Sequence, residues 1–276
     1  MRPRPGTVVC LAIVVGWLAV ALAGPLLPLE ATRVDLQALF ARPTFAAPFG
    51  YDDLGRSIAR RLLAGAHYSV SIALAVVAVS SVFGTAVGMF VAWRGGLVDL
   101  FGMRVMDTFL AFPGILLAIG LSGMLGPGLG NVVLALSVMS WVGFARLARV
   151  QTLTIKRRDH VTVARALGTP DPVILYRHVL PLIAAPLIVE ATFAIGGVVL
   201  AEAGLSYLGL GAQPPTPSWG AMIRDATQFL LVAPHMVVGP GAALLSLVVA
   251  VNVLGDRLRE RWRTGRDEPV ADGLRA

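Results

Sequence analysis

The sequence predicts an all-α integral membrane protein with about six transmembrane helices. Of its 276 residues, 56% are hydrophobic and only 14% are charged, whereas soluble domains carry about 25% charged residues. Apolar stretches of the ~20 residues that a membrane span needs recur along the chain. These spans are expected to be helical, because backbone groups cannot stay unpaired in lipid.

Six apolar stretches are the predicted spans. The uncharged residues 108–145 are too many for one span, and the turn-forming sequence GPGLGN at 126–131 divides them into a hairpin of two. The predicted spans are residues 7–28, 68–93, 108–125, 132–145, 182–210 and 236–255. The chain therefore divides into an N-terminal transmembrane anchor (1–29), an external segment (30–67), a transmembrane domain (68–262) and a cytoplasmic tail (263–276).

The first stretch also fits a signal peptide. MRPRPG precedes the apolar run, and ALAG at 21–24 offers a small-residue cleavage site. Cleavage would leave five spans and an external N-terminus. The apolar run continues through Leu26, Leu27 and Leu29, as expected of a retained anchor.

The positive charges predict the orientation. With six spans and the N-terminus inside, 17 of the 23 Lys and Arg residues lie on the inner side. This bias predicts a multi-pass protein of the inner (plasma) membrane with both termini in the cytoplasm. It also accounts for the net charge of +7 without a nucleic-acid partner.

Enzyme chemistry has little support in the sequence. The only lysine, Lys156, is followed by Arg157, so the chain has no Walker A loop for ATP hydrolysis. The four histidines are scattered without an HExxH pattern, and Cys10 is the only cysteine, so no metal site is expected. We therefore predict no catalytic residues and no directly bound cofactor.

One polar stretch, residues 157–181 (RRDHVTVARALGTPDPVILYRHVLP), interrupts the apolar chain. Asp159 can begin a helix whose apolar face carries Val161, Ala164, Leu167 and Gly168. Gly168 is placed as a helix C-terminal glycine, because the following Pro170 prevents the helix from continuing.

A second short helix follows the glycine. Asp171 and Pro172 are typical of a helix start, and Pro181 is expected to mark the beginning of the fifth span. The stretch is thus a cytoplasmic helix-Gly-helix segment. It is either a connector on the membrane surface or a rigid knob that docks into a partner, for which the small Ala164 and Ala166 are suited.

Two ionisable residues fall in a predicted span, where charge is costly and often functional, and a third lies near the cytoplasmic end of another. Glu190 and Glu202 lie twelve residues apart on the fifth span, so they face within roughly 120° of one another. They either line a path, pair with a partner subunit or are structural. Asp107 is a third candidate for the path, unless it simply pairs with Arg104 or Arg94.

The external loop 211–233 is rich in proline, and such backbone cannot cross lipid unprotected. It either dips into an outer mouth or is an ordinary loop with an interfacial tryptophan. The candidate outer-mouth residues are Gln213, Pro214, Pro215 and Trp219.

The helix-Gly-helix segment resembles the EAA loop of permease subunits of binding-protein-dependent ABC importers. The residues TVA at 162–164 occupy the E-A-A place without its Glu, Gly168 matches the glycine, and HVLP at 178–181 matches the end. Three more stretches are similar to the family. They are FGYDDLGRSIARRLLAGAHYSV at 49–70, LAEAGLSYLGLGAQPPTPSWGAMI at 200–223 and NVLGDRLRERW at 252–262, with departures at Tyr51, Ser57 and Glu260.

The resemblance covers residues 49–262 and is nearest to the C-type permeases of the dipeptide, oligopeptide and nickel subgroup. It implies a second permease subunit in a heterodimer, two ATPase subunits that carry the ATP, and an external substrate-binding protein. It also implies ATPase coupling through Val161, Thr162, Val163, Ala164, Arg165, Ala166, Gly168, Asp171, Pro172, His178 and Pro181.

We predict a translocation path for di- or oligopeptides, with nickel or another small solute as the alternative. A stand-alone secondary transporter or channel is less favoured, because such proteins typically have inverted repeats or several charged residues near the membrane midplane.

Overall fold

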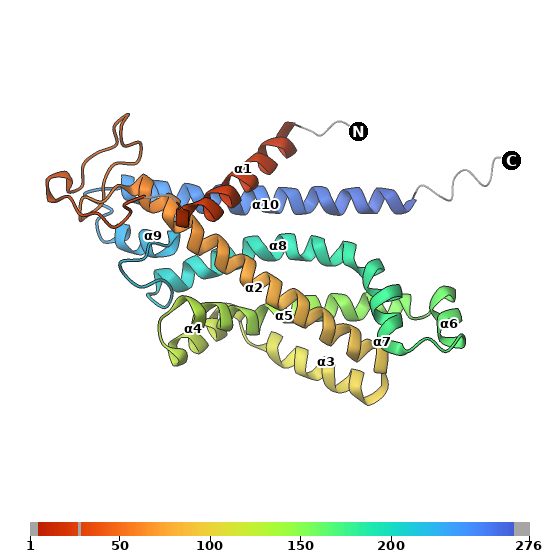
Figure 1. The fold of residues 1–276 in the computed structure, drawn as a ribbon. Helices are drawn as coiled ribbons and strands as arrows, with labels where there is room; N and C mark the ends of the chain where they lie inside the picture. The colour runs from red at the N-terminus through yellow and green to blue at the C-terminus, as the bar shows by residue number, and fades with distance from the viewer. Residues whose placement is uncertain (1–4, 27–28, 268–276) are drawn as a thin grey trace.

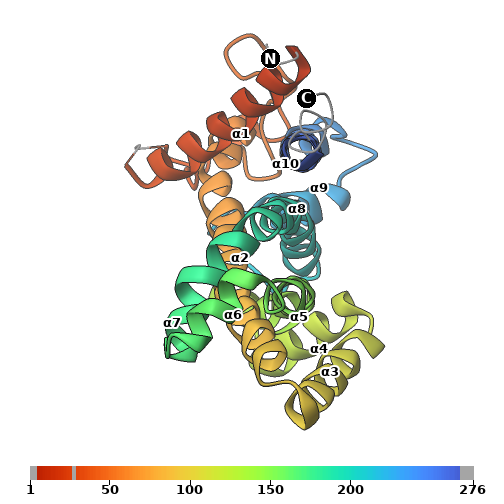
Figure 2. The same ribbon diagram turned by 90° about the vertical axis from the view of Figure 1, so that its right-hand side faces the viewer.

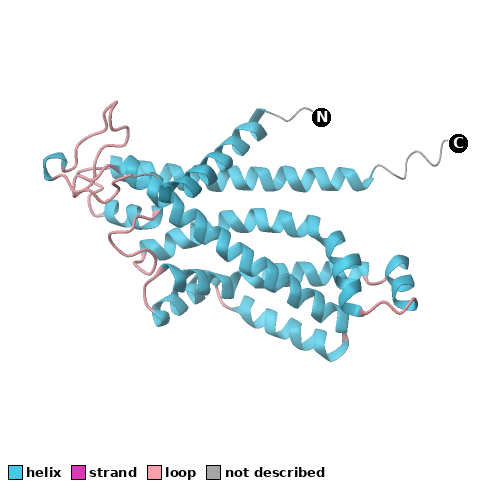
Figure 3. Cartoon of the chain, in the orientation of Figure 1, coloured by secondary structure: helices cyan, strands magenta, loops and turns pink. Residues whose placement is uncertain are grey.

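The computed structural model describes residues 5–26 and 29–267, and nearly all regular structure within these ranges is helical (Figure 1; Figure 3). The exception there is one isolated bridge between Tyr51 and Ser57. The helices are α1 (Pro5–Ala23), α2 (Ile58–Arg94), α3 (Gly96–Ala111), α4 (Gly114–Leu125), α5 (Leu129–Ile155), α6 (Asp159–Ala166), α7 (Asp171–Ile174), α8 (Leu180–Tyr207), α9 (Trp219–Thr227) and α10 (His235–Asp267). Short 3-10 turns η1 (Gly24–Leu26) and η2 (Leu36–Ala38) and a π-helical turn η3 (Leu175–Val179) complete the set. Residues 268–276 of the predicted tail lie outside the described residues.

Five helical stretches are long and apolar enough to cross a membrane, and a sixth span results if α3 and α4 together form one. These two helices meet at an angle of 84°, so the span predicted over 108–125 is not one continuous helix. The cause is Pro113, which removes a backbone donor and disfavours helical geometry at the preceding residue. Phe112 is accordingly extended, with φ −95° and ψ 138°.

The turn predicted after this bent pair is present. Gly126 and Gly128 have φ of 85° and 152°, values that favour glycine, and α5 begins at Leu129.

Helix α2 is the central element of the bundle. Its 37 residues would extend about 55 Å, and it begins ten residues before the predicted span. It packs most extensively against α5. The two backbones come close because a Cβ on Gly84 would lie 2.3 Å from the Trp141 carbonyl oxygen, and one on Gly88 would lie 2.1 Å from that of Ala145. Side chains at these positions would force the helices apart.

The remaining helices pack on both sides of this pair. Figure 2 looks along the bundle and shows α8, α10 and α1 on one side of α2 and α5, with α3 and α4 on the other. Helix α1 is tied to α10 by a hydrogen bond from Trp17 Nε1 to Ser246 Oγ, 3.0 Å long. Short α9 packs against α8 and α10 near the external loops.

Helices α7, η3 and α8 form one continuous stretch from Asp171 to Tyr207. The predicted boundary at Pro181 is therefore not a break. The π-helical turn lets the Leu180 N–H donate to the Leu175 carbonyl, five residues earlier, just before the proline. Such a wider turn accommodates the hydrogen bond that a proline cannot make.

Candidate functional site

The helix-Gly-helix segment projects beyond the membrane helices at one end of the bundle (Figure 1). The described beginning of α1 and end of α10 lie toward the same end, whereas α9 and the long loop that precedes α2 lie at the other. Two regions therefore hold nearly all the residues singled out from the sequence, one at each end.

Gly168 shapes the segment as the sequence predicted. Its φ is +79°. The N–H of Thr169 donates to the Ala164 carbonyl at 3.1 Å, and that of Gly168 donates to the Arg165 carbonyl at 3.0 Å. This pair of bonds is a Schellman motif, which uses a left-handed glycine to end a helix. Asp171 then starts α7, and Arg165 lies 3.7 Å from its carboxylate.

One face of the segment is buried against the bundle. Val161 and Ala164 belong to the core cluster, as do Ile174 and Val179 of the second half. The predicted apolar face is not buried at Leu167, which is 80% exposed, nor at Gly168, which is also exposed. Leu167 is the cap residue beyond the last helical turn, where the chain already turns toward Gly168.

Other positions of the segment expose apolar side chains. Val163, Leu167 and Tyr176 are 55%, 80% and 70% exposed, and we call them the exposed apolar face. Most other coupling candidates are exposed as well, namely Thr162, Arg165, Ala166, Gly168, Asp171, Pro172 and Pro181. His178 is half-buried, with its ring centroid 6.3 Å from that of His160.

The three carboxylates proposed for a path are not brought together. Glu202 is fully buried, and its Oε1 accepts a 2.6 Å bond from Ser206 Oγ. Glu190 is half-buried on α8 and faces Gly143 of α5, where an added Cβ would lie 3.2 Å from its Oε1. They face different neighbours within this chain.

Asp107 pairs with Arg146 of α5 at 2.6 Å, so the expected pairing with Arg104 or Arg94 is wrong. The packing of α3 beside α5 brings Arg146 to the carboxylate. Arg94 instead lies over the Phe90 ring, at 5.4 Å from its centroid.

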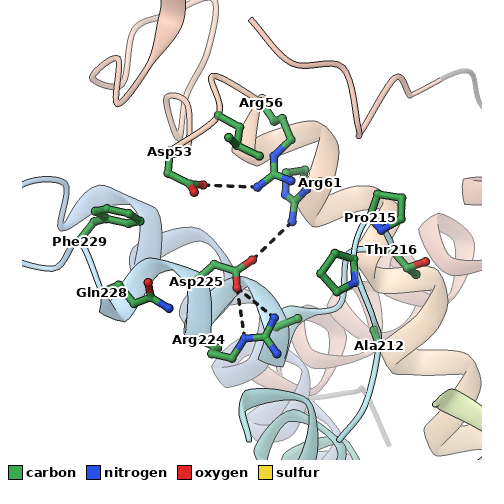
Figure 4. Close-up of a pocket in the computed structure, with 13 residues that line it drawn as sticks. Asp53, Arg56, Arg61, Ala212, Pro215, Thr216, Arg224, Asp225, Gln228 and Phe229 are labelled. Atoms are coloured by element: carbon green, nitrogen blue, oxygen red, sulfur yellow. Dashed lines mark hydrogen bonds and ion pairs between the residues drawn. The ribbon is translucent and has the colours of Figure 1, made fainter. Parts of the chain in front are cut away.

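At the other end, the outer-mouth candidates separate into two groups. Pro214 and Pro215 line a cavity of about 250 Å³ between the external segment, the α8–α9 loop and α9 (Figure 4). Trp219 is completely buried, and its Nε1 donates to the Leu62 carbonyl at 3.1 Å. Trp219 is thus an anchor of α9 rather than an interfacial tryptophan. Gln213 bonds the loop carbonyls of Gly209 and Gly211.

Ion pairs join the walls of this cavity. Arg56 binds Asp52 at 2.7 Å, and Arg61, almost fully buried, lies 3.4 Å from Asp52 and 4.0 Å from Asp225 of α9. Arg224 pairs with Asp225 at 3.1 Å. Figure 4 shows Arg61 pointing toward Asp225 across the gap between α2 and α9. These charges tie the external segment to α2 and α9.

Asp53 lies at the rim of this cavity. Burial raises the pKa of its carboxyl, and the neighbouring Asp52 carboxylate raises it further against the opposing charge of Arg56. The distance from its carboxylate to the Arg56 guanidinium is 3.4 Å, longer than the 2.7 Å between Arg56 and Asp52.

Comparison with known proteins identifies the chain. The family model described as "Binding-protein-dependent transport system inner membrane component" matches residues 84–264. The chain belongs to this family. It is the permease subunit of an ABC importer, as its resemblance to that family predicted.

Curated relatives agree with the assignment. The glutathione transport system permease protein GsiD of Escherichia coli is 41% identical over 226 residues, covering 82% of this chain and 75% of that protein. The GsiD protein of Pectobacterium atrosepticum is 40% identical over 236 residues, covering 85% and 78%.

A solved structure of the MetNI methionine ABC transporter, in an inward-facing conformation, matches the permease with a TM-score of 0.58. The match covers 72% of this chain and 95% of that chain at 19% identity, so it supports the fold alone. Permeases of this family act in a membrane together with ATPase subunits and a binding protein.

Sequence reasoning missed two residues beside the segment, Lys156 and Trp93. The Lys156 ammonium donates to the carbonyls of Ala92 and Trp93 at the end of α2. Burial lowers its pKa, and the nearby positive charge of Arg165 lowers it further. The available signals were the position of the only lysine directly before the segment and a tryptophan at the end of the second span.

Proposed function

We propose that this permease pairs with a second, different permease subunit to form a path for short peptides, and that its helix-Gly-helix segment contacts the ATPase subunits. The observation that carries the proposal is a projection with the exposed apolar face of Val163, Leu167 and Tyr176. Exposed apolar side chains on a projection of this kind are typical of a protein contact surface.

The peptide substrate is supported by the relatives. Both named relatives transport glutathione, which is a tripeptide. This favours a di- or oligopeptide, delivered by an external binding protein, over nickel. ATP would be bound and hydrolysed by the ATPase subunits, since the sequence contains no Walker A loop.

The proposed orientation places both termini in the cytoplasm. The segment that would meet the ATPases lies at the same end as the described beginning of α1 and end of α10 (Figure 1). The positive charges of the sequence favour the same side. The cavity between the external segment and α9 would then face the binding protein.

ATP-driven closure of the ATPases would move the segment, and the continuous backbone from Asp171 to Tyr207 would carry that movement into α8. The proposed path would open alternately to the two sides as α8 and its neighbours rotate.

Co-purification tests the ATPase contact. Tagged permease is expressed with its sister permease and the two ATPases, and wild type is compared with Leu167→Glu and Gly168→Arg. The control is Leu231→Glu, which changes a fully exposed leucine at the opposite end. We expect the two segment variants to lose most of the ATPase and the control to retain it. Equal retention in all four proteins would refute the contact.

Reconstituted vesicles test the substrate. With a loaded binding protein outside and ATP inside, uptake of labelled tripeptide should exceed uptake of chelated nickel. Nickel uptake without peptide uptake would assign the alternative substrate.

A further inference from the structure

Trp93, in the last turn of α2, joins the helix-Gly-helix segment to the centre of the bundle. Its side chain is only 5% exposed. The Arg165 guanidinium of α6 lies 4.7 Å from the ring centroid, and the Lys156 ammonium lies 5.4 Å from it. Both distances are within the range in which a cation is attracted to an aromatic face.

The same two cations bind other elements. Lys156 donates to the carbonyls of Ala92 and Trp93, where the C-terminal end of a helix carries partial negative charge. Arg165 lies 3.7 Å from Asp171 of α7. The cluster of Trp93, Lys156 and Arg165 therefore joins the ends of α2 and α5 to both halves of the segment.

The two cations contact the face of the Trp93 ring. Its Nε1 is buried and the structure gives it no hydrogen-bond partner. Because the buried Nε1–H makes no hydrogen bond, it does not stabilise the fold. An aromatic ring without this group should therefore make the same contact with the two cations.

Two routes lead from the segment into the bundle. The backbone of α7, η3 and α8 is continuous, so movement of α7 reaches α8 directly. No such continuity exists toward α2, which is separated in sequence from α6 by more than 60 residues. Helix α2 packs on α5, which precedes α6 by a short turn, and side chains at the end of α2 add a direct contact with α6 itself.

We propose that Trp93 is the positioning residue that transmits movement of α6 to α2, through Arg165 and Lys156. This inference rests on the proposed ATPase contact. Helix α2 is one continuous helix without an internal proline, so a displacement at Trp93 would be carried along it. Its far end holds Arg61, in the ion pairs that tie the external segment and α9.

The test separates ATPase binding from coupling. Wild type, Trp93→Leu and Trp93→Phe complexes are reconstituted, and ATPase retention, binding-protein-stimulated hydrolysis and peptide uptake per ATP are measured. Trp93→Leu keeps apolar bulk but removes the aromatic face. We expect it to retain the ATPases and to lower uptake per ATP about fivefold, the scale of a lost cation–π contact. Trp93→Phe should stay within about twofold of wild type.

Arg165→Gln gives an independent approach if Trp93→Leu fails to fold, because Arg165 is half-exposed. The double variant should lose less than the product of the two single losses, because the contact between Trp93 and Arg165 is common to both. Each single variant also removes a second contact, that of Lys156 with Trp93 or that of Asp171 with Arg165. Unchanged uptake per ATP in Trp93→Leu or in Arg165→Gln overturns the proposal, and so do losses that multiply in the double variant. A wild-type complex that retains no ATPase would instead refute the proposed function.

Discussion

Replacing Gly88 by alanine should force α2 and α5 apart. A Cβ built on Gly88 lies 2.1 Å from the Ala145 carbonyl oxygen, whereas real Cβ atoms essentially never approach within 3.0 Å. The backbones must therefore separate locally by about 0.9 Å, the difference between these two distances. Overpacking of this kind costs about 1–3 kcal/mol, because backbone atoms cannot move aside as a flexible side chain can.

A matched control isolates the clash. Alanine is the better helix former by about 1 kcal/mol, and Gly197→Ala in α8 has this gain with nothing within 4 Å of the added Cβ. We expect Gly88→Ala to unfold at a lower temperature than both wild type and Gly197→Ala. Thermal unfolding of the purified permease in mild detergent, followed by size-exclusion chromatography, measures this order. If Gly88→Ala is as stable as Gly197→Ala, the close approach of α2 and α5 is wrong.

Three further changes have defined outcomes. Gly168→Ala should destabilise the turn by about 1 kcal/mol, since L residues resist a positive φ, and Gly168→Asn should destabilise it less; thermal unfolding of the two variants checks the order. Arg149 binds Asp99 through two bonds of 2.6 Å, so Arg149→Lys should cost about 1 kcal/mol although the charge is kept, again measured by unfolding. Asp53 has a pKa raised by burial, so the stability contributed by its neutral form is present below its unfolded pKa of 3.8 and is lost as pH rises through the folded value. Asp53→Asn should therefore stabilise the permease at pH 7, with a gain that shrinks toward pH 4 in unfolding measured across that range.

The sequence predicted the parts of the fold that depend on local chemistry. The Gly168 turn follows from glycine and the proline two residues later, and the turn after α4 follows from GPGLGN. The bend at Pro113 also depends on local chemistry. It was not predicted, because residues 108–125 carry no charge and were treated as one span. The helical start of α2 was missed because Arg60 and Arg61 end the apolar pattern, while ion pairs of the folded chain compensate for burying Arg61.

Contacts between distant segments could not be predicted from one sequence. Asp107 pairs with Arg146, 39 residues away, rather than with a nearby arginine. Leu167 fits the helical period of the buried face, yet it lies past the end of α6 and points outward. Periodicity describes a helix only while the helix continues, and it says nothing about which element packs opposite.

The missing Glu of the EAA pattern changes what the segment can offer a partner. Thr162 stands at the place of that Glu, is exposed, and bonds its hydroxyl back to the Arg158 carbonyl at 3.4 Å. The helix-Gly-helix shape is therefore kept without a carboxylate at this position. Specificity for an ATPase would then rest on the exposed apolar face rather than on an ion pair made by residue 162. Shape complementarity of that face would matter more than charge, because apolar burial is not directional.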